Sequence, residues 1–202
     1  MSADTERPSV VTEGTGRIEA FSDAVMAVII TILALGLRPP DGTSWSDLAE
    51  QGDSLLIYVL AFVFIAIYWN NHHHLLRAAR RISGAVMWAN MTLLFCLSLA
   101  PVVTEWIRES PRAPLPVASF GVVSLAAAMA YTALEAALLR ANGRDSLLGR
   151  ALSNRVKGYA SLAMYAAAVA LAPVGAWIAY ALYGAVAVMW LIPDRRFTRV
   201  AA

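Results

Sequence analysis

Six long apolar segments separated by polar loops constrain this chain more than any other feature. Most have the ~17–25 residues that a helix needs to cross ~30 Å of hydrocarbon, and the fifth is the shortest. Charged residues make up only 15% of the sequence, against about 25% in soluble domains. We therefore predict an all-α integral membrane protein with six transmembrane helices. The predicted spans are residues 18–37, 54–71, 84–104, 116–139, 158–172 and 175–192.

The basic residues fall almost entirely on one side of the membrane when alternate loops are compared. Of the 16 Lys and Arg residues, only Arg38, Arg108 and Arg112 belong to the other side. Cytoplasmic loops carry the excess of basic residues in membrane proteins, so we expect both termini in the cytoplasm. We expect a multi-pass protein of the plasma membrane, in contact with lipid. A formal net charge of +2 is too small to favour a nucleic-acid partner.

The chain reads as one membrane domain between two tails. Residues 1–16 are polar and contain proline and glycine, so we expect a disordered cytoplasmic tail. The membrane domain covers residues 17–193, and a basic cytoplasmic tail covers 194–202. The single cysteine, Cys96, lies in an apolar segment, which excludes a disulfide framework.

The first apolar segment has two different faces. At about 100° per residue, Val28, Ile32 and Leu35 form one narrow stripe with Thr31 on its edge. Asp23 lies roughly 140° from that stripe. An acid at the mouth of an apolar helix is costly in lipid and is normally buried against protein or water. This helix is therefore expected to contact two different surroundings.

Polar and aromatic motif residues gather at the ends of the first three segments. They read Arg17-x-x-x-Phe21-Ser22-Asp23, Trp69-x-x-His72-His73-x-Leu75 and Trp88-x-Asn90. Together they resemble the prokaryotic members of the transmembrane protein 175 family, potassium channels whose animal relatives sit in endosomes and lysosomes.

The resemblance implies a specific architecture. Prokaryotic members carry one six-span repeat per chain and form homotetramers around a central pore lined by the first helix, without a filter loop. Rings of apolar side chains narrow that pore, and a threonine layer is linked to selectivity. Carried over by offset from the motif, these positions are Val28, Thr31, Ile32 and Leu35. The implied function is passive, modestly potassium-selective conduction, with K⁺ as the permeant ion and no cofactor. Such apolar rings can gate by dewetting.

Two interpretations of Asp23 are open. In the first, Ser22 or Asp23 satisfies free N–H groups at a helix start and complements the helix dipole. In the second, Asp23 joins Arg17 and the Trp69, His72 and His73 end of the second span in a buried network. The motif residues Phe21 and Asn90 border the same helix ends.

The histidine triplet invites a metal site, but its spacing disfavours one. Consecutive helical residues diverge by about 100°, so His72, His73 and His74 cannot all meet one ion. Metal-binding histidines on helices prefer a spacing near i, i+4. We therefore predict no metal site. No Ser–His, two-acid or H-E-x-x-H arrangement lies within the spans, so we expect no enzymatic activity either.

A rival function uses the acids of the apolar segments. Asp23, His73 and Glu135 would form the relay of a proton-coupled or proton-conducting carrier. Alternatively, Glu135 snorkels or pairs with Arg140 or Arg144. The sequence shows no internal repeat and no glycine-broken helix of the kind carriers use at a midplane site.

Overall fold

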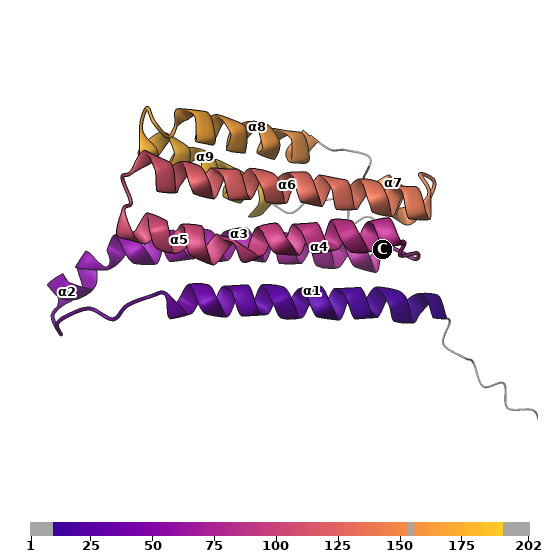
Figure 1. Ribbon diagram of the computed structural model, residues 1–202, viewed down its shortest axis with the longest axis horizontal. Helices are drawn as coiled ribbons and strands as arrows, with labels where there is room; N and C mark the ends of the chain where they lie inside the picture. The colour runs from indigo at the N-terminus through magenta and orange to yellow at the C-terminus, as the bar shows by residue number, and fades with distance from the viewer. Residues whose placement is uncertain (1–9, 153–155, 192–202) are drawn as a thin grey trace, which may run out of the picture.

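The computed structural model describes residues 10–152 and 156–191, and this part of the chain consists of helices joined by loops (Figure 1). The long helices lie side by side along the longest axis of the molecule. The helices are α1 (Val10–Leu35), α2 (Trp45–Glu50), α3 (Gly52–Arg77), α4 (Gly84–Ser98), α5 (Ala100–Glu109), α6 (Pro114–Asn142), α7 (Leu147–Ala151), α8 (Val156–Leu171) and α9 (Ala176–Leu191).

Four helices in the described ranges are long and apolar enough to cross a membrane. They are Thr15–Leu35 within α1, Gly52–Arg77 (α3), Gly84–Glu109 (α4 and α5 taken together) and Pro114–Asn142 (α6). The predicted fifth and sixth spans appear as α8 and α9, which are apolar but have only 16 residues each. At 1.5 Å per residue, the part of each helix that the structure describes rises about 24 Å, less than the ~30 Å hydrocarbon layer.

α1 begins earlier than the sequence suggested. Residues 10–16 are helical, although we expected them to belong to a disordered tail. No proline interrupts them, and an interior glycine costs a helix only about 1 kcal/mol relative to alanine. Asp23 therefore lies roughly three and a half turns inside α1. The interpretation of Ser22 or Asp23 as a helix-start device was wrong. The expected basic tail, 194–202, lies outside the described residues.

The predicted third span is interrupted once. α4 and α5 are separated only by Leu99, whose φ of −82° and ψ of −15° keep the chain in the right-handed helical region. Pro101 explains the break, because proline has no N–H to donate and its ring crowds the carbonyl four residues earlier.

The loop between the first and second predicted spans contains the short helix α2. Ser44 Oγ accepts a hydrogen bond from the Asp47 amide at 3.2 Å, and the Ser44 amide donates to Asp47 Oδ2 at 2.8 Å. This reciprocal pair is a capping box. The hydrogen bonds from the side chain and backbone of Ser44 hold the pKa of Asp47 below its usual value.

The layers of the bundle place α1 at one edge and α8 at the other (Figure 1). The side chains of Met26, Ile29 and Leu33 are buried where α1 packs against α3 and α4. The other side of α1 carries no helix of the described chain in this view. α1 is thus held by one face only, which positions the residues described next.

Candidate pore face and motif network

The apolar stripe predicted on α1 lies on its uncovered face. Val28, Ile32 and Leu35 expose 56%, 48% and 83% of their surface, whereas Met26 and Leu33 expose 1% and 2%. Thr31 is also exposed, and its Oγ1 donates to the Val28 carbonyl at 2.8 Å. With its proton engaged by the backbone, the hydroxyl oxygen keeps a lone pair directed away from the helix.

A buried chain of hydrogen bonds joins α1, α4 and α3. Asn90 Nδ2 donates to Ser22 Oγ at 3.0 Å, and Ser22 Oγ donates to the Ile18 carbonyl at 2.8 Å. His72 Nε2 lies 2.7 Å from Asn90 Oδ1, which makes the ring nitrogen the donor. Ser22, Asn90 and His72 are all buried. Each link satisfies a polar group that would otherwise be costly in an apolar bundle.

A second group lies at the half-buried rim of the α1–α3 crossing. Trp69 Nε1 donates to Asp23 Oδ1 at 3.0 Å, and the Trp69 ring stacks on His73 with centroids 5.8 Å apart. His73 Nδ1 lies 2.8 Å from Glu19 Oε1, at ion-pair distance but without hydrogen-bond angles. Three atoms lie within 4.8 Å of one another: a carboxylate oxygen of Glu19, a carboxylate oxygen of Asp23 and a ring nitrogen of His73.

The motif residues therefore divide into two groups rather than one network around Asp23. Neighbouring residues on a helix point about 100° apart. Ser22 and His72 consequently face the interior, while Asp23 and His73 face the rim. Sequence reasoning missed Glu19, although its i, i+4 spacing from Asp23 places both acids on one face of α1.

Arg17 and Phe21 take no part in either group. Arg17 is exposed, and no ion pair joins it to Asp23 among the contacts of the described residues. Phe21 is 50% exposed on α1. The predicted contact between Arg17 and Asp23 is therefore absent from this structure of the single chain.

The opposite end of α1 is tied to α5. Arg108 donates through Nη1 to the Gly36 carbonyl and through Nη2 to Glu105 Oε2. Its side chain is 8% exposed. Arg38 lies 3.9 Å from the same carboxylate of Glu105. The last carbonyl groups of a helix have no hydrogen-bond donor within the helix, and the Arg108 guanidinium supplies one here.

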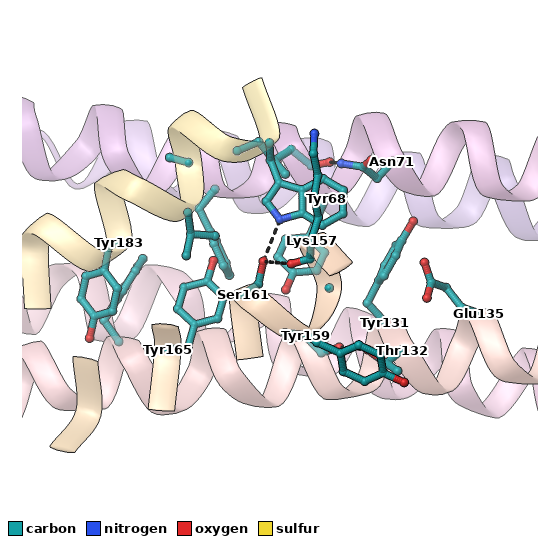
Figure 2. A pocket seen from close by; sticks show the side chains of 18 of the residues that line it. Tyr68, Asn71, Tyr131, Thr132, Glu135, Lys157, Tyr159, Ser161, Tyr165 and Tyr183 are labelled. Atoms are coloured by element: carbon teal, nitrogen blue, oxygen red, sulfur yellow. Dashed lines mark hydrogen bonds between the residues drawn. The ribbon is translucent and has the colours of Figure 1, made fainter. Parts of the chain in front are cut away.

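Glu135 lies apart from the two groups on α1 and α3. It lines a cavity of about 80 Å³ between α3, α6, α8 and α9, with Tyr131, Lys157 and Tyr159 also in its wall (Figure 2). Neither Asp23 nor His73 lines this cavity. The three residues of the predicted proton relay are not brought together.

The family follows from comparison with known proteins. The family model described as "Endosomal/lysosomal potassium channel TMEM175" matches residues 17–101, which hold most of α1 and all of α3 and α4. A potassium channel of Chryseobacterium sp. (strain P1-3) is 44% identical over 184 residues, covering 91% of this chain and 96% of that protein. The chain belongs to the TMEM175 family. The resemblance seen in the sequence motifs is thereby confirmed.

Two further matches place this TMEM175 chain among its relatives. A crystal structure of a lysosomal potassium-selective channel TMEM175 homolog from Chamaesiphon minutus matches with a TM-score of 0.71 at 24% identity. That match covers 89% of this chain and 97% of the other. It establishes a shared fold. The endosomal/lysosomal proton channel TMEM175 of Mus musculus is 22% identical over 120 residues, which are 57% of this chain but 24% of the mouse protein.

Proposed function

We propose that four copies of this chain form a potassium-permeable cation channel whose pore is lined by α1. The observation that carries the proposal is the uncovered stripe of Val28, Thr31, Ile32 and Leu35 on a helix whose opposite face is buried. Fourfold assembly around that stripe would cover it and enclose a narrow apolar passage. The TMEM175 relative with 44% identity is named a potassium channel, which supports the choice of ion.

The passage would work by excluding water rather than by binding ions tightly. An apolar constriction of a few Å makes an ion shed part of its hydration shell. The pore therefore conducts only when the constriction is wide enough to remain filled with water. Four Thr31 hydroxyl oxygens would replace part of that shell, because their protons already bond the Val28 carbonyls. So few oxygen ligands give modest selectivity for K⁺ over Na⁺.

The motif groups would act as braces for this helix. Ser22 is hydrogen-bonded to α4 and through it to α3, while Asp23 is hydrogen-bonded to α3 directly. These contacts fix the rotation of α1 about its axis, so that the stripe faces away from the bundle. They hold the pore helix in place without any of these side chains contacting the permeant ion.

The proposed topology has six spans with both termini in the cytoplasm of a plasma-membrane protein. α8 and α9 serve as the fifth and sixth spans. Each has 16 helical residues in the described part of the chain, and local thinning of the bilayer would accommodate helices of that length.

The proposal is tested by reconstituting the purified protein in liposomes. Potassium and sodium fluxes are measured under imposed gradients, with and without a pH gradient. Passive flux that favours potassium and ignores the pH gradient supports the channel. Flux that appears only when protons move as well would replace it with a proton-coupled carrier.

Proton conduction is the second candidate function, because the mouse relative is named a proton channel. In that account Asp23, His73 and Glu135 would relay the proton. Their separation into the rim of the α1–α3 crossing and the cavity beside α6 weighs against a single relay.

A further inference from the structure

The rim of the α1–α3 crossing holds a set of side chains that metal ions favour. Glu19 and Asp23 lie one turn apart on α1, and His73 faces them from α3. Carboxylate oxygens and an imidazole nitrogen are ligand types that zinc accepts, and three protein ligands leave its fourth position open to water. We propose that Glu19, Asp23 and His73 bind a divalent transition-metal ion such as Zn²⁺.

The distances are compatible with one ion. The three ligand atoms lie within 4.8 Å of one another, and His73 Nδ1 is already 2.8 Å from Glu19 Oε1. Ligands that share a zinc ion at about 2.0–2.2 Å are roughly 3.3 Å apart, so small side-chain rotations suffice. Glu19 and His73 expose only 22% and 28% of their side chains, which limits competition from bulk water.

Atoms around the three ligands provide independent support. His73 Nδ1 is buried and has no hydrogen-bond partner, although Glu19 is near it. The Trp69 indole fixes Asp23 through Oδ1 and stacks on the His73 ring. Such outer contacts orient metal ligands and raise affinity.

The side chain of Arg77 has to move when the ion binds. Arg77 Nη1 lies 3.4 Å from His73 Nε2, a long contact that requires the ring proton on Nδ1. Metal on Nδ1 requires that nitrogen to be unprotonated. Arg77 is exposed, so its side chain can turn toward solvent. His74, which packs edge-on against His73 at 5.6 Å, is not one of the three ligands.

The ion would join α1 to α3 at the end where the motif residues lie. This inference does not depend on ion conduction, because binding is measured without any flux. Imidazole and carboxylate donors favour Zn²⁺, Co²⁺ and Ni²⁺, whereas Mg²⁺ prefers an all-oxygen octahedral shell. We therefore expect the site to bind Zn²⁺, Co²⁺ and Ni²⁺ more tightly than Mg²⁺.

Co²⁺ is the direct probe. Full-length protein in detergent, freed of any polyhistidine tag, is titrated with Co²⁺ while visible absorption is followed, and Zn²⁺ is then added as competitor. We expect a saturable band at one Co²⁺ per chain that Zn²⁺ removes and Mg²⁺ does not. No band, or one with more than one Co²⁺ per chain and no saturation, overturns the proposal.

Matched variants locate the ion. Glu19→Gln and His73→Gln should each weaken apparent Co²⁺ affinity at least tenfold, and Trp69→Phe roughly tenfold through loss of the indole contact to Asp23. His74→Gln is the control and should bind like the original chain. Circular dichroism verifies that each variant is folded. Unchanged affinity in folded Glu19→Gln, or equal loss in His74→Gln, would contradict the assignment.

Discussion

His72 Nε2 lies 2.7 Å from Asn90 Oδ1, and both side chains are shielded from solvent in the interior of the bundle. The Asn90 side-chain amide donates one hydrogen bond through Nδ2 to Ser22 Oγ of a third helix. A single side chain of α4 thus joins α3 to α1. In an apolar surrounding this link is worth more than its own two hydrogen bonds, because its loss leaves the buried His72 ring without a partner and removes one of the two hydrogen bonds of Ser22.

Replacing Asn90 with alanine should therefore destabilise the fold by about 1–3 kcal/mol. The measurement is the midpoint of thermal unfolding in detergent. Thr92→Ala is the matched control, because Thr92 is exposed on the same helix and bonds only the Trp88 carbonyl. Equal midpoints for the two variants would show that the buried chain does not stabilise the protein.

The contribution of Asp23 to stability should depend more on its hydrogen bond to Trp69 than on its charge. Asp23→Ala removes the acceptor for the Trp69 indole and should cost about 1 kcal/mol. Asp23→Asn keeps an acceptor oxygen and should cost less. Unfolding midpoints measured with a chelator present separate this effect from metal binding. Asparagine proving as costly as alanine would argue that the charge itself is required.

Arg108 should stabilise the far end of α1. Arg108→Met removes the donors to the Gly36 carbonyl and to Glu105, and we expect a loss of about 1–3 kcal/mol. Faster proteolysis in the loop after Leu37 should accompany it. Arg112→Met, at an exposed position of the following turn, is the control. A destabilisation by Arg112→Met of the same size would point to a general charge effect.

The two faces of α1 should respond differently to truncation. Ile32→Ala on the uncovered stripe should raise potassium flux severalfold by widening an apolar ring, with little change in stability. Ile29→Ala on the buried face should instead lower stability by about 2–5 kcal/mol. Fluxes and unfolding midpoints of both variants are compared. A reversed pattern would mean that α1 is rotated relative to the bundle described above.

Hydropathy predicted the positions of the helices well, because every apolar segment is helical near the expected residues, the third as the pair α4 and α5. The limits of α1 were harder to predict, since residues 10–16 contain two glycines but no proline. The break at Leu99 had a visible signal in Pro101. Ser44 and Asp47 also formed a readable capping pattern for α2.

The sequence predicted part of the membership of the candidate site but not the arrangement of its residues. Its motif residues were expected to surround Asp23, yet Ser22 and Asp23 diverge by the ordinary rotation of a helix, as do His72 and His73. Which of each pair faces the interior depends on how α1, α3 and α4 rotate against one another, which the spacing within one helix does not determine. Glu19 was missed because only the histidines were weighed as metal ligands.

Thiol modification at Thr31 tests the pore assignment most directly. Thr31→Cys is made with Cys96→Ala, reconstituted in liposomes, and treated with a charged methanethiosulfonate reagent while potassium flux is recorded. Glu50→Cys, at an exposed position of α2, is the control. We predict that the reagent labels both cysteines and lowers flux only at position 31. Full labelling at position 31 with unchanged flux, or no labelling there at all, would contradict a pore lined by α1.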